Sequence, residues 1–244
     1  MAARLAAMAA LLVVAVTLYR CWQLLPGPNP WPRRFLSVIG RLAGLRIRTV
    51  GTRAPGRVLL LANHVSWLDI PALAGTTGCG FVAHDGLAEV PLVRRLCAMH
   101  RTVFIARHDK ASIARQVGAL REALALGEAL ALFPEGTTSD GTLLLPFKSA
   151  LLAALDPLPP GLAVQPVWLD YGAAAQEIAW VGDEPGIANC KRILARARPI
   201  PLTLHFLAPL PAAALAGRKP MTAAARGAIA DAMGQPLQIA APLA

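Results

Sequence analysis

The sequence predicts an α/β fold, in which one domain has a mixed, partly parallel sheet flanked by helices. Short apolar segments of strand length alternate with segments of helical periodicity, an order that favours parallel strands. A chain of 244 residues can form one substantial domain with an appendage. The expected strands are residues 47–50, 58–62, 81–83, 102–105, 129–133, 164–168 and 202–206.

The chain begins with an apolar segment, residues 5–19, that lies uncharged between Arg4 and Arg20. Apolar residues resume over 21–25, and a full membrane span takes about 20 residues. We expect residues 1–26 to be a membrane-anchoring helix, either spanning or half-inserted. A cleaved signal peptide and a buried soluble helix are the alternatives. The arginines that follow favour the cytoplasmic face of a membrane, expected to be a bacterial inner membrane.

Residues 27–45 are expected to hold a proline-rich break and then an amphipathic helix. Arg34 and Arg41 lie on the polar side of this helix. A basic helix with a tryptophan anchor is typical of segments that lie among the headgroups of anionic lipid. The alternative is an ordinary helix that covers the core. The shared apolar face consists of Trp31, Phe35, Val38, Ile39 and Leu42.

The net charge of +10 is concentrated at the N-terminal end, because residues 1–68 contain nine arginines and no acidic residue. Hydrophobic residues make up 55% of the chain and the mean hydropathy is +0.50, which favours membrane association. The arginines alternate with apolar residues, without zinc-finger or RNP-type spacing, so nucleic acid is not an expected partner. The four cysteines form no C-x-x-C pair, so no metal site is expected.

The expected main domain spans residues 46–210 and contains its clearest helix at 109–126, with an inner stripe of Ile113, Val117, Leu120 and Leu124. Residues 211–244 are expected to be a linker and a C-terminal helix, the latter at 222–233.

The expected strand at 58–62 ends abruptly at a polar stretch that contains His64 and Asp69. Ser66 and Asp69 have capping-box spacing, which predicts a helix that begins near Trp67. A carboxylate in the first helical turn can point back and hold the His64 ring in one tautomer. In the alternative interpretation, Asp69 only caps the helix and His64 is a loop residue.

Polar residues follow three of the expected strands: His64, Arg107 and the Pro-Glu-Gly-Thr turn at 134–137. Parallel strands would bring these residues to one edge of the sheet, where α/β proteins bind ligands. The site would then hold a base, a cation, a carboxylate and backbone N–H groups that can face an anion. No G-x-S-x-G elbow occurs, so the expected nucleophile is a hydroxyl of the substrate, and an acyl thioester is a suitable electrophile.

Four sequence blocks resemble the signatures of the glycerolipid acyltransferases, the 1-acylglycerol-3-phosphate acyltransferase family. Residues 63–69 resemble N-H-x-x-x-x-D, 102–107 resemble the F-I-x-R block, and 133–137 read F-P-E-G-T. Residues 164–167 resemble the fourth block, a strand that carries a proline. The blocks occur in the family's order over residues 58–171.

The resemblance implies a role for each matching residue. His64 would deprotonate the acceptor hydroxyl, Asp69 would orient His64, and Arg107 would bind the acceptor phosphate. Pro166 would line a substrate pocket. The acceptor site would also include Glu135, Gly136, Thr137 and Lys148.

The reaction implied by the resemblance moves an acyl group from acyl-CoA or acyl carrier protein to 1-acyl-glycerol-3-phosphate and gives phosphatidic acid, without a cofactor. The alternatives are another lyso-lipid acceptor, such as lyso-ornithine lipid, and a non-catalytic lipid-binding protein. Two residues depart from the family pattern: Arg101 replaces a common glycine and His84 a common lysine. These departures concern the acceptor headgroup rather than the reaction.

Overall fold

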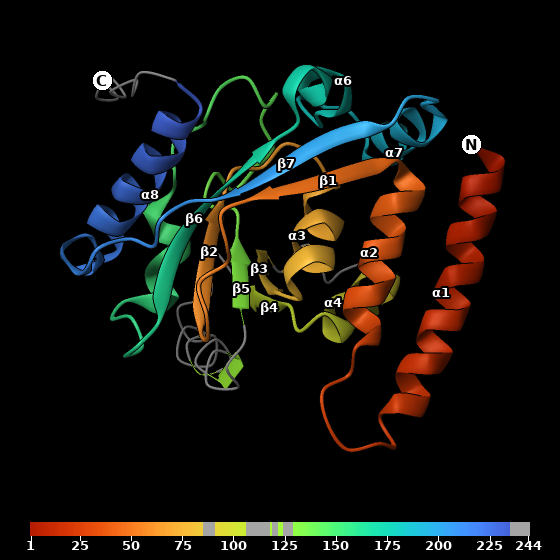
Figure 1. The fold of residues 1–244 in the computed structure, drawn as a ribbon, viewed down its shortest axis with the longest axis horizontal. Coiled ribbons are helices and arrows are strands. Elements are labelled where there is room, and N and C mark those ends of the chain that lie inside the picture. Colours follow the sequence, from red (N-terminus) through yellow and green to blue (C-terminus); the bar gives the residue numbers. More distant parts are fainter. Residues whose placement is uncertain (85–90, 106–117, 119–121, 124–128, 235–244) are drawn as a thin grey trace.

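The computed structural model describes residues 1–84, 91–105, 118, 122–123 and 129–234 and contains a seven-stranded sheet of order β1-β7-β6-β2-β5-β3-β4 (Figure 1). The strands are β1 (Leu45–Val50), β2 (Val58–Ala62), β3 (Gly80–His84), β4 (Val103–Ile105), β5 (Ala129–Leu132), β6 (Ala163–Asp170) and β7 (Ile200–Phe206). Only the β6–β7 pair is antiparallel among these strands. The expected α/β class and its mixed sheet are therefore confirmed, and each expected strand overlaps an observed one.

Helices cover both faces of the sheet. The longer ones are α1 (Ala2–Trp22), α2 (Trp31–Ala43), α3 (Asp69–Thr77), α4 (Pro91–Met99), α7 (Gly186–Ala195) and α8 (Arg218–Ala232). Shorter elements are α6 (Ala175–Ile178) and the 3₁₀ turns η3 (Ser149–Leu155), η4 (Gly172–Ala174) and η5 (Ala212–Leu215). The helix expected at 109–126 falls almost entirely outside the described residues.

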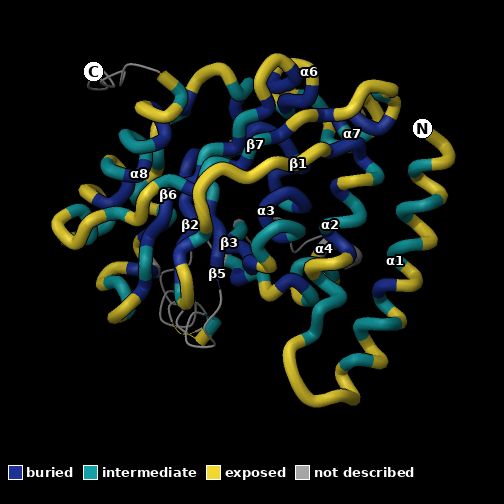
Figure 2. Tube along the Cα trace, viewed as in Figure 1, coloured by how far each residue is buried: buried dark blue, intermediate teal, exposed yellow. Residues whose placement is uncertain are grey.

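The central strand β2 is apolar throughout because both of its faces are covered (Figure 2). Its residues Val58 and Leu60 join a core cluster with α2, α3 and α7. Leu59 and Leu61 face the other way, toward η3 and α8. Burial on both faces explains why this strand reads as a continuous apolar run rather than an alternating one.

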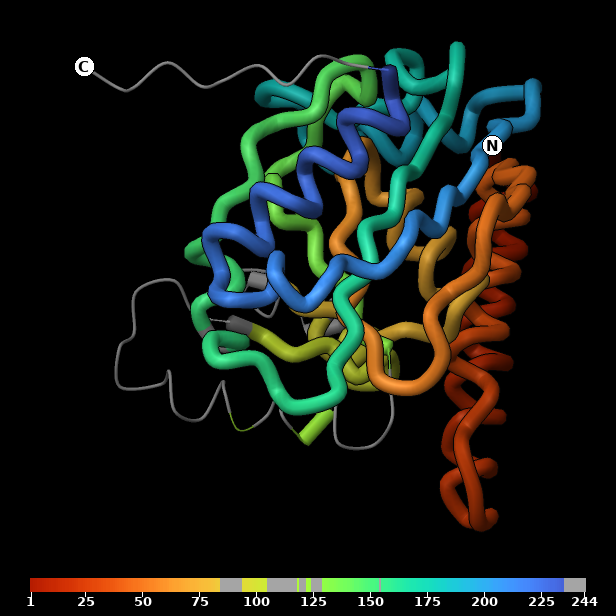
Figure 3. The backbone as a smooth tube through the Cα atoms, turned by 60° about the vertical axis from the view of Figure 1, so that its left-hand side comes forward, coloured from red at the N-terminus to blue at the C-terminus, as the bar shows by residue number. Residues whose placement is uncertain are grey.

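The first two helices form a hairpin whose loop projects beyond the rest of the molecule (Figures 1 and 3). Side-chain bonds close the loop, from Trp22 Nε1 to the Pro28 carbonyl and from Asn29 Nδ2 to the Tyr19 carbonyl. At the opposite end of α1, Arg4 donates to backbone carbonyls beside the end of α7. The first helix is therefore attached to the domain along its length.

Helix α2 covers the core with its apolar side, as the alternative interpretation of its sequence predicts. Phe35 and Leu36 are buried, and the helix packs between α1 and α3. Its Arg34 and Arg41 remain exposed. Contact of these arginines with anionic lipid stays a prediction.

The prediction that a helix begins near Trp67 was wrong by two residues, because α3 begins at Asp69 and follows Leu68. The Ser66 hydroxyl lies 3.5 Å from the Leu68 nitrogen and caps no helical N–H. Instead, the Asp69 carboxylate accepts the backbone N–H of Ser66, so only one half of the expected capping box forms.

Candidate active site

The contact between His64 and Asp69 expected from the sequence forms where β2 ends. His64 Nδ1 lies 2.7 Å from Asp69 Oδ2, which also accepts the backbone N–H groups of Val65 and Ser66 at 2.7 and 3.0 Å. Asp69 is fully buried, whereas the His64 side chain is 19% exposed. An Nδ1–H that donates to Asp69 leaves Nε2 as the unprotonated nitrogen, which can accept a proton from a substrate.

The ring of His64 is also fixed by an aromatic neighbour. Phe133, which directly follows β5, stacks on it with ring centroids 4.1 Å apart and an interplanar angle of 12°. Phe81 in turn stacks on Phe133 at 6.0 Å. The imidazole is thus held by a carboxylate at one nitrogen and by an aromatic face, so its direction is set before substrate arrives.

Glu135 joins the site through the backbone of His64. Its Oε1 accepts the His64 N–H at 2.8 Å, and its Oε2 accepts the Leu145 N–H at 3.1 Å. Burial raises the pKa of Glu135 from 4.5 to about 8, and the charge of Asp69 adds to this effect, while the two N–H donors and Arg226 oppose it. In this structure Glu135 therefore shapes the His64 loop and holds a proton near neutral pH.

The raised pKa of Glu135 predicts a pH-dependent stability. Between pH 4.5 and about 8 the folded protein binds a proton that the unfolded chain does not, so stability falls as pH rises. We expect the melting temperature of wild type, measured relative to Glu135→Gln, to decrease steadily over this range. The free-energy scale is about 1.4 kcal/mol per pH unit. Parallel melting curves at every pH would show that Glu135 is ionised throughout.

The glycine turn and Lys148 lie together, as expected from the sequence. Gly136 has φ +70°, and a Cβ added there would lie 3.3 Å from Lys148 Nζ. The Lys148 N–H donates to the Pro134 carbonyl at 2.8 Å, which holds the lysine beside the turn. Thr137 is exposed at the end of the turn. The ammonium of Lys148 therefore lies over the glycine, where it can meet an acidic group of a substrate.

Two other predicted residues have different outcomes. Pro166 is buried in β6 opposite Leu61, and its contact with substrate stays a prediction. Arg107 lies outside the described residues. No cluster of three metal-ligating side chains occurs within the described part of the chain.

Sequence reasoning assigned no individual role to three residues that support the site. Tyr171, directly after β6, donates its hydroxyl to Asp69 Oδ1 at 2.6 Å. Asn63 exchanges two hydrogen bonds with the backbone of Leu169, which ties the end of β2 to β6. Arg226 on α8 donates to the carbonyls of Leu144 and Leu145 and so steadies the loop that contacts Glu135. For Asn63 and Tyr171 the available signal was their place just after predicted strands, whereas Arg226 lies within a predicted helix and gave no such signal.

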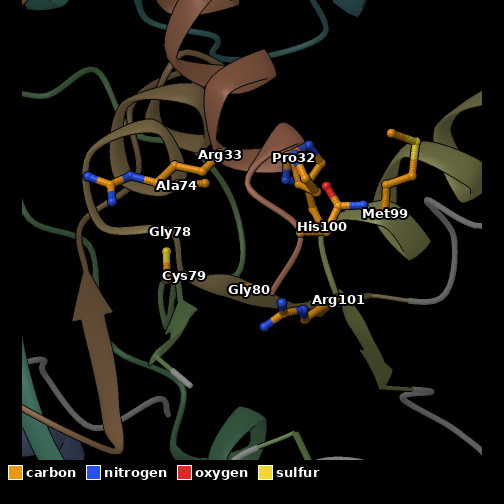
Figure 4. A pocket seen from close by; sticks show the side chains of 10 residues that line it. Pro32, Arg33, Ala74, Gly78, Cys79, Gly80, Met99, His100 and Arg101 are labelled. Carbon is orange, nitrogen blue, oxygen red and sulfur yellow. The ribbon is translucent and has the colours of Figure 1, made fainter. Parts of the chain in front are cut away.

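A separate crevice lies under the hairpin, at the other edge of the sheet (Figure 4). Its lining includes Arg33, Gly80, His100 and Arg101. Gly80 begins β3, whereas His64 follows the end of β2, and both strands run parallel to β5. The crevice and the His64–Asp69 pair therefore lie at opposite ends of the parallel strands. Arg101, at φ +52°, holds the left-handed conformation that suits the family's glycine.

Comparisons with known proteins find similar acyltransferases. A family model described as Acyltransferase matches residues 46–170. The chain is 36% identical over 185 residues to the lyso-ornithine lipid O-acyltransferase of Brucella abortus (68% of this chain, 69% of the relative). It is 32% identical over 250 residues to the lyso-ornithine lipid O-acyltransferase of Rhodobacter capsulatus (96% and 90%).

Two further similarities concern 1-acylglycerol-3-phosphate acyltransferases. The chain is 38% identical over 114 residues to the 1-acyl-sn-glycerol-3-phosphate acyltransferase of Neisseria gonorrhoeae (46% of this chain, 45% of the relative). The crystal structure of the 1-acyl-sn-glycerophosphate (LPA) acyltransferase PlsC from Thermotoga maritima matches with a TM-score of 0.61 and 17% identity, covering 95% of this chain and 96% of that one. At 17% identity, the similarity to the Thermotoga maritima structure concerns the fold alone.

Proposed function

This chain belongs to the acyltransferase family, and from that premise we propose that it transfers a fatty acyl group from a thioester to the free hydroxyl of lyso-ornithine lipid. The observation that carries the proposal is the His64–Asp69 pair, 2.7 Å apart beside the turn that contains Glu135 and Gly136. Acylation of 1-acyl-glycerol-3-phosphate, the expectation from sequence motifs, becomes the second candidate. The relatives matched over most of the chain are named for lyso-ornithine lipid, which favours this acceptor.

The reaction follows from the two nitrogens of His64. Nε2 takes the proton of the acceptor hydroxyl as its oxygen attacks the thioester carbonyl. Asp69, held by Nδ1–H, stabilises the imidazolium that forms. The tetrahedral intermediate then expels the thiolate of acyl-CoA or acyl carrier protein, which takes the proton from His64. The ester and the free thiol leave, and the imidazole returns to its starting state.

The proposed binding partner of the acceptor headgroup is the ammonium of Lys148. Ornithine carries a carboxylate, and 1-acyl-glycerol-3-phosphate carries a phosphate, so a lysine ammonium over the Gly136 turn suits either acid. Arg107, by its place in the F-I-x-R block, is proposed as a second cation for the same group. Thr137 and Pro166 complete the proposed substrate contacts.

The test is an acceptor comparison with the purified full-length protein in lipid vesicles. Lyso-ornithine lipid and 1-acyl-glycerol-3-phosphate are each supplied with labelled acyl-CoA and with labelled acyl carrier protein. We expect kcat/KM for lyso-ornithine lipid to be at least about 10-fold higher, the range of one well-placed polar contact. The reverse preference would establish the second candidate. Transfer to neither acceptor by the folded protein would favour a non-catalytic lipid-binding role.

We also propose that the hairpin attaches the enzyme to the cytoplasmic face of a membrane. Helix α1 is long and apolar enough to cross a membrane, with a mean hydropathy of 2.0 and only 6% of the span buried. Its attachment to α2 and α7 supports half-insertion with the loop foremost, because a free span could not keep these contacts. Leu24 and Leu25 at the loop are 87% and 54% exposed.

This arrangement predicts that the loop leucines control membrane binding but not folding. We expect Leu24→Asp/Leu25→Asp to release the protein from vesicles containing anionic lipid, because burying two carboxylates in the bilayer is costly. The melting temperature should be unchanged, since neither side chain is buried in the protein. Flotation of vesicles measures the binding. Undiminished flotation of the double variant would contradict insertion of the loop.

A further inference from the structure

The two carboxylate oxygens of Asp69 have different hydrogen-bond partners. Oδ2 faces His64 Nδ1 and two backbone N–H groups. Oδ1 accepts the hydroxyl of Tyr171 at 2.6 Å, a bond between groups 102 residues apart. Both side chains are almost fully buried, at 0% and 2% exposure. No water competes with a donor at this depth, so the hydroxyl makes a charge-assisted hydrogen bond to a dry carboxylate.

Two consequences follow from this bond. The first is geometric, because a carboxylate held at Oδ1 cannot rotate and must keep Oδ2 toward His64. The second is electrostatic, because a donor at Oδ1 draws negative charge away from the oxygen that faces the imidazole. Burial, and then the charge of Asp69, raise the pKa of Tyr171 well above its usual value, so the phenol remains a donor at every working pH.

We propose that Tyr171 is a positioning residue for acyl transfer, which acts on His64 by fixing the orientation of Asp69 and the charge on its carboxylate. The proposal rests on the proposed function for the reaction but not on the identity of the acceptor. The other ionisable groups that bear on the pair are Glu135, which interacts with Asp69, and Arg226, which interacts with Glu135. Neither bonds to Asp69 Oδ1.

The first test is Tyr171→Phe in the full-length protein, with Tyr19→Phe as the matched control. Tyr19 is the only other tyrosine of the chain and lies on α1. Loss of the hydroxyl leaves more negative charge on Asp69, which favours the imidazolium form of His64. We expect the acid limb of kcat/KM to move to higher pH by about one unit, so that activity below the limb falls by up to about 10-fold. Tyr19→Phe should leave the profile unchanged.

A second variant keeps the fold while changing the donor. Fluorotyrosine at position 171, incorporated in the Tyr19→Phe background, is nearly isosteric and donates a stronger hydrogen bond. We expect it to move the acid limb in the opposite direction, to lower pH. If the Tyr171 hydroxyl had only a structural role, Tyr171→Phe would lower the melting temperature, and neither variant would change the pH profile of kcat/KM. That outcome would overturn the proposal.

A readout independent of turnover separates this proposal from the proposed function. If the folded protein acylates no lyso-lipid, the proposed function fails, whereas the position of Tyr171 is still tested by the ¹⁵N shifts of the His64 ring. We expect these shifts to differ between wild type and Tyr171→Phe over the same pH range. Identical shifts at every pH would overturn the positioning role.

Discussion

Replacing His64 by alanine should lower acyl transfer by about 10³-fold while the protein stays folded. General-base catalysis typically contributes about 10²–10⁴-fold, and no other described side chain bonds to Asp69 Oδ2 in its place. Folding should persist because the backbone bonds of His64 with Glu135 and Ser139 remain in alanine. The buried carboxylate of Asp69 also keeps its bonds from Val65, Ser66 and Tyr171. Initial rates with lyso-ornithine lipid and a melting curve measure the two effects.

The control for this substitution is a histidine outside the site. His205 on β7 stacks on Trp168, and its Nε2 lies 3.8 Å from Asp170. His205→Gln should keep nearly full activity, since the reaction does not use this ring. Equal turnover by wild type and His64→Ala would end the general-base assignment. A loss in His205→Gln as large as in His64→Ala would point to general damage rather than catalysis.

The sheet was predictable because its strands are strongly apolar and are followed by polar residues. Strand β2 was expected with the observed bounds, since burial on both faces requires a continuous apolar run. Parallel pairing of β2 with β5 then brings the polar residues after these strands to one edge. The contact of His64 with Asp69 follows from their spacing of five residues, which a tight turn at the start of a helix can close.

Contacts between distant residues could not be predicted in the same way. Tyr171 reaches Asp69 only because β6 pairs with β2 in one register, in which Ala62 lies opposite Val167. A sequence pattern can predict a strand, but it does not show which residues of a distant parallel strand will lie opposite it. Arg226 likewise contacts the loop at Leu145 only after α8 has packed on the sheet.

Helix α2 shows why an amphipathic sequence does not reveal whether its apolar face contacts lipid or protein. The same apolar face suits a lipid surface and a protein core, because both exclude water. The structure packs Phe35 and Leu36 against protein, and only tertiary packing distinguishes the two cases. Contact of the exposed Arg34 and Arg41 with lipid stays a prediction.

Replacing Asp69 by asparagine should lower kcat by about 10²–10⁴-fold and leave the fold intact. The asparagine oxygen can accept the N–H groups of Val65 and Ser66, and its amide can donate to the Tyr171 oxygen. Shape and most of the hydrogen bonds are therefore kept, although the Tyr171 O–H loses its acceptor, while the negative charge that stabilises the imidazolium is lost. The melting temperature should stay within a few degrees of wild type, and single-turnover rates should fall.

Asp69→Ala removes both the negative charge and the buried hydrogen-bond acceptor. Comparing it with Asp69→Asn therefore separates the effect of the charge on catalysis from the effect of the acceptor on folding. Asp69→Ala leaves two buried N–H groups and the Tyr171 hydroxyl without an acceptor, at about 1–3 kcal/mol each. That total is comparable with the whole stability of a domain, so this variant should be largely unfolded. If Asp69→Asn instead kept a tenth or more of wild-type turnover, Asp69 would be a structural cap. His64 would then work without a charged partner, and the role proposed for Tyr171 would lose its target.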